Sequence, residues 1–389
     1  MSVTAPRGFL ASGVAAGLKS SDRPDLGLLV SERMATAAGL FTRNAFAAAP
    51  VEICRRRLMD GTARAIVANS GQANAGTGPE GFDDAEAVTA AVAQALSHTG
   101  IEPTDVLPAS TGVIGPRLRV GAAVEGVQVA AASLTDDGGR DFAEAIRTTD
   151  NVAKQTEVRG AAFTVGGCAK GAGMIAPDLA TLLVFLTTDA ACTPAVAAHA
   201  LRQGAAPIWN ALTVDNCPST NDTVLLLANG ASGVEPTPDE LAEVVREATR
   251  DLAAQIAAYA EGATTTLVVQ VDGAASDADA RRIGRAVAGS MLVKTAVFGK
   301  DPNPGRILQA IGASGARFRP EAVHASLGAV RVIDAGAIPP SFDPAACTDA
   351  MKEREVVIRV GVGVGDGRAT SFGCDLGYEY VRINGEYTT

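Results

Sequence analysis

The chain has 389 residues, of which 47% are hydrophobic and 20% charged, so it is long enough for one large or two ordinary globular domains. These values exclude the disordered and fibrous classes. The formal net charge of -10 gives no electrostatic reason to bind nucleic acid or an anionic membrane, because both need a basic surface. Small-molecule or protein partners are therefore favoured.

The cysteine and histidine spacing gives no sign of a metal site. Six cysteines show no Cys-x-x-Cys pair, and three histidines stand far from them, so neither a zinc site nor a disulfide framework fits. Residues 1–20 lack the continuous apolar core of a signal peptide, and no later run reaches the length of a membrane span. We therefore expect a cytoplasmic protein with reduced thiols.

Apolar and β-branched runs alternate with helical patterns along the chain, which indicates a mixed α and β class. Some strands follow one another directly, so we expect sheets with antiparallel pairs between helix layers rather than a doubly wound parallel sheet. The predicted strands are 27–31, 63–69, 162–167, 181–187, 223–229, 265–271, 329–333 and 356–362, and the predicted helices are 84–97, 119–132, 138–147, 194–203, 238–260 and one from Ser276 on.

The clearest helix is 238–260. Thr237 supplies an N-cap, Pro238 a first-turn proline and Glu240 a capping-box acid ahead of apolar residues at helical spacing. Glu261 and Gly262 mark the expected end of this helix.

Two glycine-rich segments do not fit nucleotide-binding loops. In GGCAKGAGM (166–174) the lysine precedes the glycine pair and no Gly-Lys-Ser/Thr follows, so a P-loop is missing. GVGVGDGR (361–368) lacks the third glycine of the dinucleotide spacing and indicates a strand that leads into an Asp-Gly turn.

Thr181 opens the apolar run TLLVFL, and on these residues alone it is most simply the first residue of a buried strand. The preceding loop suggests more, since Gly171 and Gly173 would let the backbone approach a reacting group and small Ala180 leaves its carbonyl open to attack. A threonine hydroxyl needs a base, and no histidine is near. If the bond between Ala180 and Thr181 is cut, the freed α-amino group could be that base. The same hydroxyl could make the cut.

Acyl chemistry also needs donors for a tetrahedral oxyanion. The segment PASTGVIG (108–115) supplies the Thr111 hydroxyl and the Gly112 backbone N–H, which we expect in a compact turn. A Ser-Thr-Gly turn without any catalytic role fits this segment equally well.

Ten segments, in order along almost the whole chain, carry a stronger signal: TAPRGF (4–9), FTRN (41–44), NSGQANAGTG (69–78), STGVIG (110–115), TTDN (148–151), KGAGMIAPDLATLL (170–183), STNDT (219–223), AEGAT (260–264), LVKTAVFGKDPNPGR (292–306) and NGEYTT (384–389). Together they resemble the ornithine acetyltransferases of arginine biosynthesis, also called glutamate N-acetyltransferases. A chance match to one such segment is easy, but a match to ten in order is not.

The resemblance implies an α+β fold of the N-terminal-nucleophile kind, a layered α/β/β/α sandwich with a second, smaller α/β lobe. We expect a main catalytic domain at 1–280 and a C-terminal lobe at 281–389 whose tail returns to the active site. The resemblance also implies that the chain cuts itself between Ala180 and Thr181 into an α chain (1–180) and a β chain (181–389).

The activity that the resemblance implies is acetyl transfer through Thr181, which takes the acetyl group from N-acetylornithine, releases ornithine and passes the group to glutamate. Thr111 and Gly112 correspond to the oxyanion donors, and Lys170 would adjust the Thr181 amino group or contact substrate. The expected substrate contacts are Thr148, Lys170, Thr181, Glu261, Asn384 and Thr389. No cofactor is implied, although acetyl-CoA is possible as an alternative acetyl donor, and the αβ units would associate into a homo-oligomer, for example a heterotetramer of two α and two β chains.

Two positions depart from the family pattern. Pro304 stands where the family usually has tryptophan, and Thr265 where it commonly has lysine. Neither is a nucleophile or an oxyanion donor, so the departures put in question the amino-acid pair rather than the acyl chemistry. The alternatives are a secondary-metabolite relative with another acyl donor or acceptor, an amidohydrolase of the same fold, and an inactive binding subunit. The presence of Thr181, Thr111 and Gly112 argues against the last.

Overall fold

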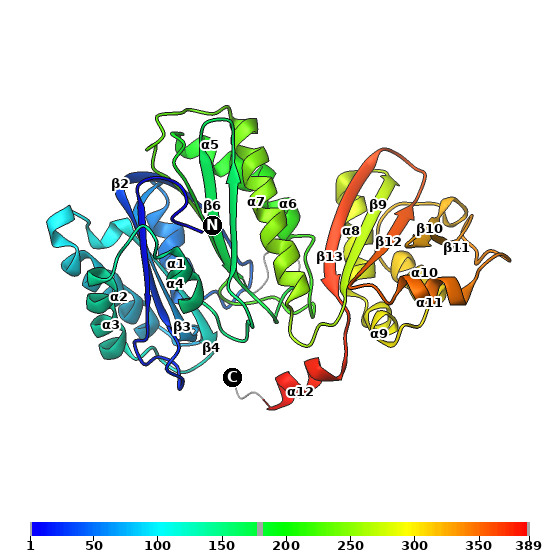
Figure 1. Ribbon diagram of the computed structural model, residues 1–389, viewed down its shortest axis with the longest axis horizontal. Coiled ribbons are helices and arrows are strands. Elements are labelled where there is room, and N and C mark those ends of the chain that lie inside the picture. The colour runs from blue at the N-terminus through cyan, green and yellow to red at the C-terminus, as the bar shows by residue number, and fades with distance from the viewer. Residues whose placement is uncertain (1, 177–181, 387–389) are drawn as a thin grey trace.

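The long strand β2 (Leu26–Phe41) organises the larger lobe of the computed structural model, which describes residues 2–176 and 182–386 (Figure 1). Its first half pairs with β1 (Phe9–Val14) and β3 (Thr62–Gln72), and its second half pairs with β8 (Thr223–Ala228). Its register with β3 shifts between Val30 and Ala35, and a shift of this kind bends and twists a strand. One strand is thus shared by two half-sheets.

The two half-sheets contain both parallel and antiparallel pairs. β4 (Val106–Val113) lies outside β3 in the first, and β7 (Leu183–Thr188), β6 (Thr164–Lys170) and β5 (Lys154–Arg159) continue from β8 in the second. The pairs β3 with β4 and β7 with β8 are parallel, and the other pairs of this sheet are antiparallel. The expectation of a mixed sheet instead of a doubly wound parallel one is confirmed.

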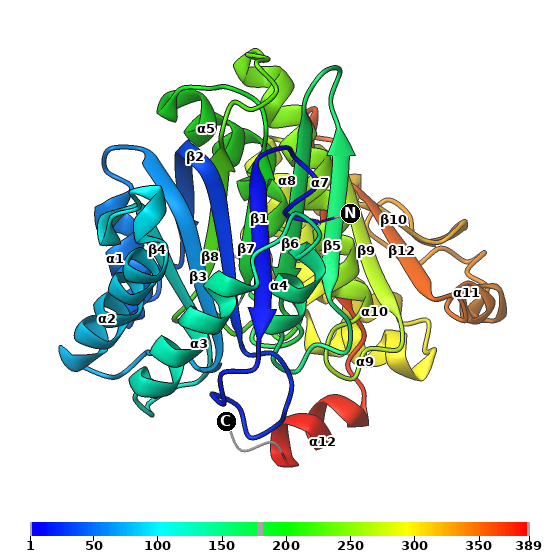
Figure 2. The same cartoon turned by 60° about the vertical axis from the view of Figure 1, so that its left-hand side comes forward.

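Side chains alternate between layers along these strands. Leu183, Phe185 and Ile66 pack in the core between the half-sheets, whereas Val184 and Leu186 point to the other side and pack against α7 (Pro238–Ala258). On the opposite outer face, β3 packs against α2 (Glu80–Ala95) and α3 (Val120–Ala132). The layers are therefore α/β/β/α, as expected, and Figure 2 shows the strands between the two helix layers. Burial on both faces explains why LVFL (183–186) is apolar without alternation.

The remaining helices of this lobe are α1 (Ala49–Arg57), α4 (Gly139–Ala145), α5 (Pro194–Ala200), which continues through a π-helical turn (Leu201–Ala205), and α6 (Ala206–Trp209). The predicted capping box of α7 is confirmed, because the Thr237 side chain accepts from the Glu240 N–H and the Glu240 side chain accepts from Thr237. The end differs slightly from the prediction. α7 ends at Ala258, and Gly262 takes its positive φ of 67° in the following turn.

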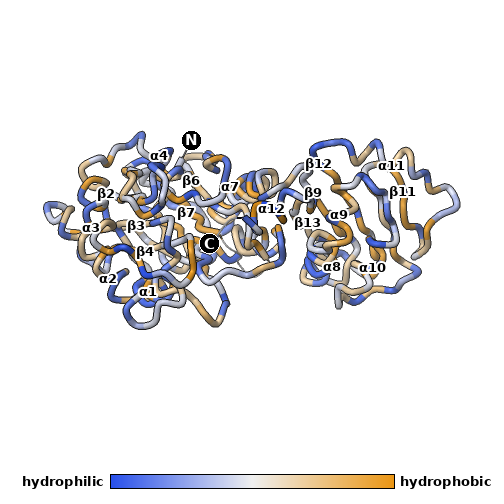
Figure 3. The backbone as a smooth tube through the Cα atoms, turned by 90° about the horizontal axis from the view of Figure 1, so that it is seen from below, coloured by the Kyte–Doolittle hydropathy of each residue, from blue (hydrophilic) through white to orange (hydrophobic). Residues whose placement is uncertain are grey.

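The smaller lobe contains a five-stranded sheet in the order β11 (Val330–Ile333), β10 (His324–Leu327), β12 (Glu355–Gly361), β9 (Thr266–Ala274) and β13 (Gly367–Cys374). Its helices are α8 (Asp277–Gly289), α9 (Met291–Gly299), α10 (Pro304–Gly312) and α11 (Pro344–Ala350). This sheet includes β9, which lies before residue 280 in the sequence. The division into domains at 1–280 and 281–389 stays a prediction. α7 and α12 (Tyr378–Glu386) lie where the two lobes meet (Figure 3).

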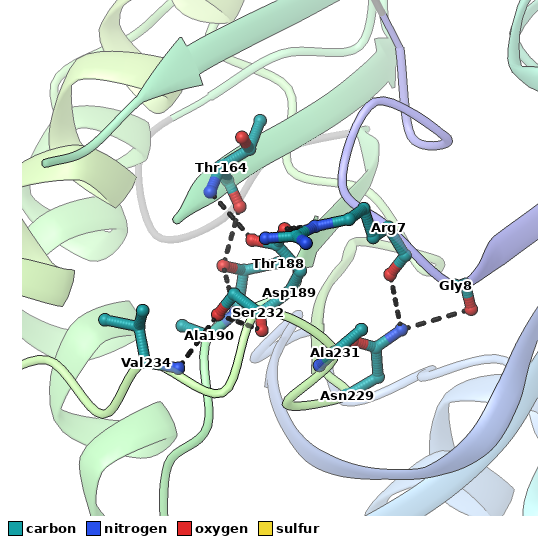
Figure 4. Close-up of polar contacts among 10 residues, drawn as sticks. All are labelled: Arg7, Gly8, Thr164, Thr188, Asp189, Ala190, Asn229, Ala231, Ser232 and Val234. Carbon is teal, nitrogen blue, oxygen red and sulfur yellow. Dashed lines mark hydrogen bonds and ion pairs between the residues drawn. The ribbon is translucent and has the colours of Figure 1, made fainter. Parts of the chain in front are cut away.

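A polar cluster ties the N-terminal segment to the loops after β7 and β8 (Figure 4). The buried Asp189 carboxylate accepts from the Thr164 N–H at 2.8 Å and from Arg7 Nε at 3.4 Å. The Asn229 amide donates to the carbonyls of Arg7 and Gly8 at 2.9 and 3.1 Å. These bonds close one end of the sandwich.

Several elements were not predicted from the sequence, among them β1, β4, β5 and α12. The segment PASTGVIG was expected as a compact turn, but residues 106–113 form β4 and the prediction is wrong there. β4 is an outer strand, and an outer strand tolerates the missing N–H of Pro108. Among the described residues, no helix combines the length and apolar character needed to cross a membrane.

Candidate active site

One cavity at the ends of β4 and β6 collects six of the predicted site residues, Thr111, Gly112, Thr148, Lys170, Glu261 and Asn384. They come from β4, β6, the turn after α4, the turn after α7 and α12, so the fold brings together segments that are far apart in the sequence. The other described residues of its wall are Ala73, Ile114, Thr149, Gly173, Met174, Ser219, Thr220, Asn221 and Ile383.

Thr111 and Gly112 lie near the end of β4. Lys170 Nζ donates to Thr111 Oγ1 at 3.2 Å, and both side chains are buried. Gly112 has a φ of 125°, and a Cβ at this position would clash with the backbone of Gly71 on β3. Only glycine fits there without strain. The end of β4 therefore presents a hydroxyl and a glycine backbone to the cavity.

Asp150 connects Lys170 to the start of the loop that follows it. The Asp150 carboxylate accepts from Lys154 Nζ at 2.5 Å and from the Gly171 N–H at 2.8 Å, and neither the Asp150 nor the Lys154 side chain is exposed. Burial raises the pKa of Asp150, but the charges of Lys154 and Lys170 outweigh it and lower this pKa to about 2. Asp150 is thus a carboxylate at neutral pH.

Lys170 is less basic than an ordinary lysine. Burial is the largest cause of its lowered pKa, and the nearby Lys154 charge adds to it, while Asp150, Glu261 and Asp222 act in the opposite direction. A lysine of this kind can give up and accept a proton more readily than an exposed one.

Glu261 joins the glycine loop to the C-terminal helix. Its N–H donates to the Ala172 carbonyl at 2.8 Å, and its carboxylate accepts from the Asn384 amide at 2.9 Å. A Cβ on Gly173 would overlap the Glu261 carboxylate, so this glycine allows the carboxylate to lie against the loop backbone. α12 thereby reaches the wall of the cavity.

Asp215 holds the same loop and helix from another side. Its carboxylate accepts from the N–H groups of Met174 and Ile175 at 2.5 and 2.8 Å, and the Tyr380 hydroxyl donates to it at 3.1 Å. Residues 174 and 175, just before the undescribed segment, and α12 are therefore fixed to one carboxylate.

Three predicted residues, Ala180, Thr181 and Thr389, lie outside the described part of the chain. The nearest described neighbour of Thr181 is Leu182, whose N–H donates to Asp222 Oδ1 at 3.0 Å. Asp222 is fully buried, and burial raises its pKa well above the ordinary value. A carboxyl group is thus bound to the backbone one residue after the predicted nucleophile.

Sequence reasoning assigned no role to Asn221, Asp150 or Asp222. The Asn221 amide donates to the carbonyls of Ala73 and Ser110 at 2.6 and 2.8 Å, which fixes the end of β4. All three residues lie in the segments TTDN and STNDT, so their place in these motifs was the available signal.

Pro304 and Thr265, the two positions that depart from the family pattern, lie outside the described wall of the cavity. Pro304 is the first residue of α10, and buried Thr265 accepts from Lys300 Nζ at 2.8 Å. Neither is among the described residues that line the cavity. They therefore give no direct reason to expect a different cavity wall.

Comparison with known proteins places the chain in a family. A model of the ArgJ family matches residues 10–389. The chain belongs to the ArgJ family. It is 46% identical to the arginine biosynthesis bifunctional protein ArgJ of Symbiobacterium thermophilum, over all of this chain and 98% of that protein, and 44% identical to the protein of the same name from Synechocystis sp., with the same coverage. The resemblance found in the sequence is confirmed.

A solved structure agrees with this membership. The bifunctional protein ArgJ of Bacillus halodurans is 37% identical with a TM-score of 0.50, and the match covers 52% of this chain and 98% of that one. An ornithine acetyltransferase of Mycobacterium tuberculosis, complexed with ornithine, is 43% identical with a TM-score of 0.42, over 47% of this chain and 96% of that one. The solved Bacillus halodurans chain thus corresponds to about half of the present chain.

Asp150→Asn should destabilise the fold, because it leaves two buried lysines without their carboxylate. We expect the free energy of unfolding at pH 7 to fall by about 3 kcal/mol or more, as measured by urea denaturation. Adding Lys154→Met should restore part of this loss. Equal stability of Asp150→Asn and the original chain would contradict the role of the ion pair.

The same ion pair predicts an acid dependence. The pKa of Asp150 is lowered on folding, so its stabilisation is present above the unfolded value near 4 and is lost as the pH falls through about 2. Protonation of this carboxylate alone should lower the free energy of unfolding by about 2 kcal/mol over that range. Urea denaturation from pH 5 to pH 2 should show a smaller acid loss in Asp150→Asn than in the original chain.

Proposed function

We propose that the chain is a self-processing N-acetyltransferase that moves the acetyl group from N-acetylornithine to glutamate through an acetyl-Thr181 intermediate. Its membership of the ArgJ family identifies it as an N-acetyltransferase. The observation that carries the finer proposal is the cavity in which Thr111, Gly112, Lys170 and Glu261 meet.

Processing comes first in this mechanism. The Thr181 hydroxyl attacks the Ala180 carbonyl and the peptide C–N bond breaks, which leaves an ester and a free α-amino group on Thr181. Water then hydrolyses the ester to give the Ala180 carboxylate and the free hydroxyl. The anchored neighbours of this segment support the step, since Leu182 is bound by Asp222 on one side and Ile175 by Asp215 on the other.

Acetyl transfer uses the same hydroxyl. The α-amino group takes the hydroxyl proton as the oxygen attacks the acetyl carbonyl, and the Thr111 hydroxyl and Gly112 N–H donate to the oxyanion. The amide bond breaks, and ornithine leaves with the proton. The glutamate amine then attacks the ester to give N-acetylglutamate and restore the hydroxyl. Lys170, bonded to Thr111 and of lowered pKa, would hold that hydroxyl and adjust the Thr181 amine.

Substrate binding follows from the charges of the cavity. Both substrates carry an α-carboxylate, which Lys170 and the Thr148 hydroxyl would bind, and the Glu261 carboxylate would meet the ornithine ammonium. Asn384, bonded to Glu261, would fix that carboxylate. Thr389 would add a contact from the C-terminal end.

The matched length of a relative supports processing. The cut after Ala180 would divide the chain close to its middle, and the solved Bacillus halodurans chain matches 52% of this chain over nearly its whole length. On the same family membership we propose that αβ units associate in the cytoplasm into a homo-oligomer such as a heterotetramer. The reaction needs no cofactor, and acetyl-CoA would serve as an alternative donor.

Denaturing electrophoresis with intact-mass measurement tests processing. The purified protein should give two fragments, residues 1–180 and 181–389, instead of one chain of 39.4 kDa. Thr181→Ala should stay whole and inactive, since it lacks the nucleophile, whereas Thr181→Ser should still be cut because it keeps a hydroxyl. An unbroken but active original chain would overturn the proposal.

The oxyanion role of Thr111 predicts a specific kinetic loss. Thr111→Val keeps the shape but removes the donor, and we expect kcat with N-acetylornithine and glutamate to fall about 10²–10³-fold with little change in KM. Thr111→Ser retains the hydroxyl and serves as the control. A Thr111→Val enzyme with unchanged kcat would show that this hydroxyl does not stabilise the transition state.

A further inference from the structure

A second cavity adjoins the candidate active site and is strongly basic. Its charged wall residues are Lys19, Arg23, Arg119 and Arg147 against the single carboxylate of Glu144. The chain as a whole carries a net charge of -10, so this concentration of cations contrasts with the rest of the molecule. Such a cavity attracts anions.

The loop between β1 and β2 builds one side of this cavity. The fully buried Asp25 carboxylate accepts from the N–H groups of Ala16 and Leu18, both at 2.6 Å, and of Lys19 at 2.9 Å. Arg119 Nη1 donates to the Gly17 carbonyl at 2.8 Å. In Figure 2 this loop lies at the same end of the molecule as α12. The cations are thus held by a fixed loop.

Some donor capacity remains on these cations. Arg147 donates to the Asp150 carbonyl from Nε and Nη2 at 3.1 and 2.7 Å and to Glu144 from Nη1, which leaves two of its five N–H groups. Lys19 Nζ donates to the carbonyls of Pro24 and Arg147 at 3.1 and 2.6 Å, which leaves the third hydrogen of its ammonium group. Arg119 and Arg23 are exposed at the rim. The Glu144 carboxylate is already bonded to Arg147, so the single acid of the wall does not neutralise the other three cations.

Burial and the nearby cations contribute to a lowered pKa of Lys19. Burial is the main cause that lowers its pKa to about 8, Asp25 opposes this, and the charges of Arg147, Lys170 and Arg23 lower it further. An anion bound beside these groups would relieve the repulsion.

The two cavities share part of their walls. Gly112 and Thr148 line both the basic cavity and the candidate active site. A ligand in the basic cavity therefore lies directly behind the proposed oxyanion donor, within reach of the acyl-transfer cavity. The basic cavity has a volume of about 680 Å³, which is more than one carboxylate needs.

We propose that Lys19, Arg23, Arg119 and Arg147 form a binding site for the phosphate groups of a small ligand, next to the acyl-transfer cavity. Guanidinium groups match the oxygens of a phosphate in pairs, and several cations on opposite walls suit a group with two or more negative charges. The phosphates belong either to a free anion or to the phosphorylated end of an acyl carrier whose thioester reaches past Gly112. Only the second use rests on the proposed acetyl transfer.

Calorimetric titration of the purified full-length protein with inorganic pyrophosphate at low ionic strength tests the site. We expect saturable binding that weakens about tenfold or more in Arg23→Gln/Arg119→Gln, because charged hydrogen bonds are lost. Arg317→Gln/Arg354→Gln, which removes two exposed arginines of the smaller lobe, should bind as the original chain does. No saturable binding, or equal weakening in both double variants, would overturn the proposal.

Sulfate provides a second readout, since it does not titrate near neutral pH. Its binding should weaken as the pH rises from 7 to 9, because the pKa of Lys19 is about 8 and its positive charge is lost over this range. Lys19→Met should abolish this dependence and keep weaker binding through the arginines. Binding that is independent of pH in the original chain would exclude Lys19 from the site.

Competition distinguishes the two sources of phosphate. Displacement of pyrophosphate by acetyl-CoA would assign the site to an acyl carrier. If pyrophosphate binds and acetyl-CoA does not displace it, the site is assigned to a free anion. Because these titrations measure no acyl transfer, a negative result would leave transfer from N-acetylornithine untouched, and a failure of that transfer would leave the pyrophosphate result standing.

Discussion

The buried ion pair between Asp150 and Lys154 is the interaction on which the candidate active site depends. The same carboxylate accepts from the Gly171 N–H and faces the charge of Lys170. One group therefore allows a lysine to remain buried in the cavity and also fixes the first residue of the glycine loop. Its three interactions lie in the core, where removal of one charge leaves the others uncompensated.

The bent strand β2 joins the parts of the sheet that surround this ion pair. By joining the two half-sheets, it lets the end of β4 face the end of β6, so that Thr111 from one meets Lys170 from the other. The polar cluster around Asp189 closes one end of the sandwich, while Asp215 and Glu261 hold the glycine loop and α12 at the cavity. The proposed catalytic groups thus lie on strand ends that the core makes rigid, which suits a reaction that needs fixed oxyanion donors.

Local sequence signals predicted part of this fold well. The run Leu183–Thr188 is buried on both faces and could be recognised as the strand β7, and Thr237 and Glu240 formed the capping box of α7. The strand β4 was not predicted because Pro108 and Gly112 are typical of turns. A strand is acceptable there only because β4 lies at the outer edge of the sheet, which depends on long-range pairing. α12 lacked any buried residue that would have given a periodic pattern.

Prediction of the candidate site from sequence was limited in the same way by long-range contacts. The roles of Thr111 and Gly112 were hypotheses from the chemistry of hydroxyl and backbone donors, whereas those of Lys170, Glu261 and Asn384 came only from the family resemblance. Asp150 and Asp222 were not recognised, because each acts through a contact with another segment, Gly171 in one case and Leu182 in the other. Such contacts depend on how the strands pair, which a single sequence does not specify.

The most direct test of the proposed chemistry is to find the acetyl group on the enzyme. The protein would be mixed with N-acetylornithine in the absence of glutamate, quenched with acid and mapped by peptide mass spectrometry. The account predicts one acetyl group on the peptide that begins with Thr181, lost when glutamate is added before the quench. An acetyl group on Lys170 instead, or steady turnover with no acetylated peptide, would contradict it.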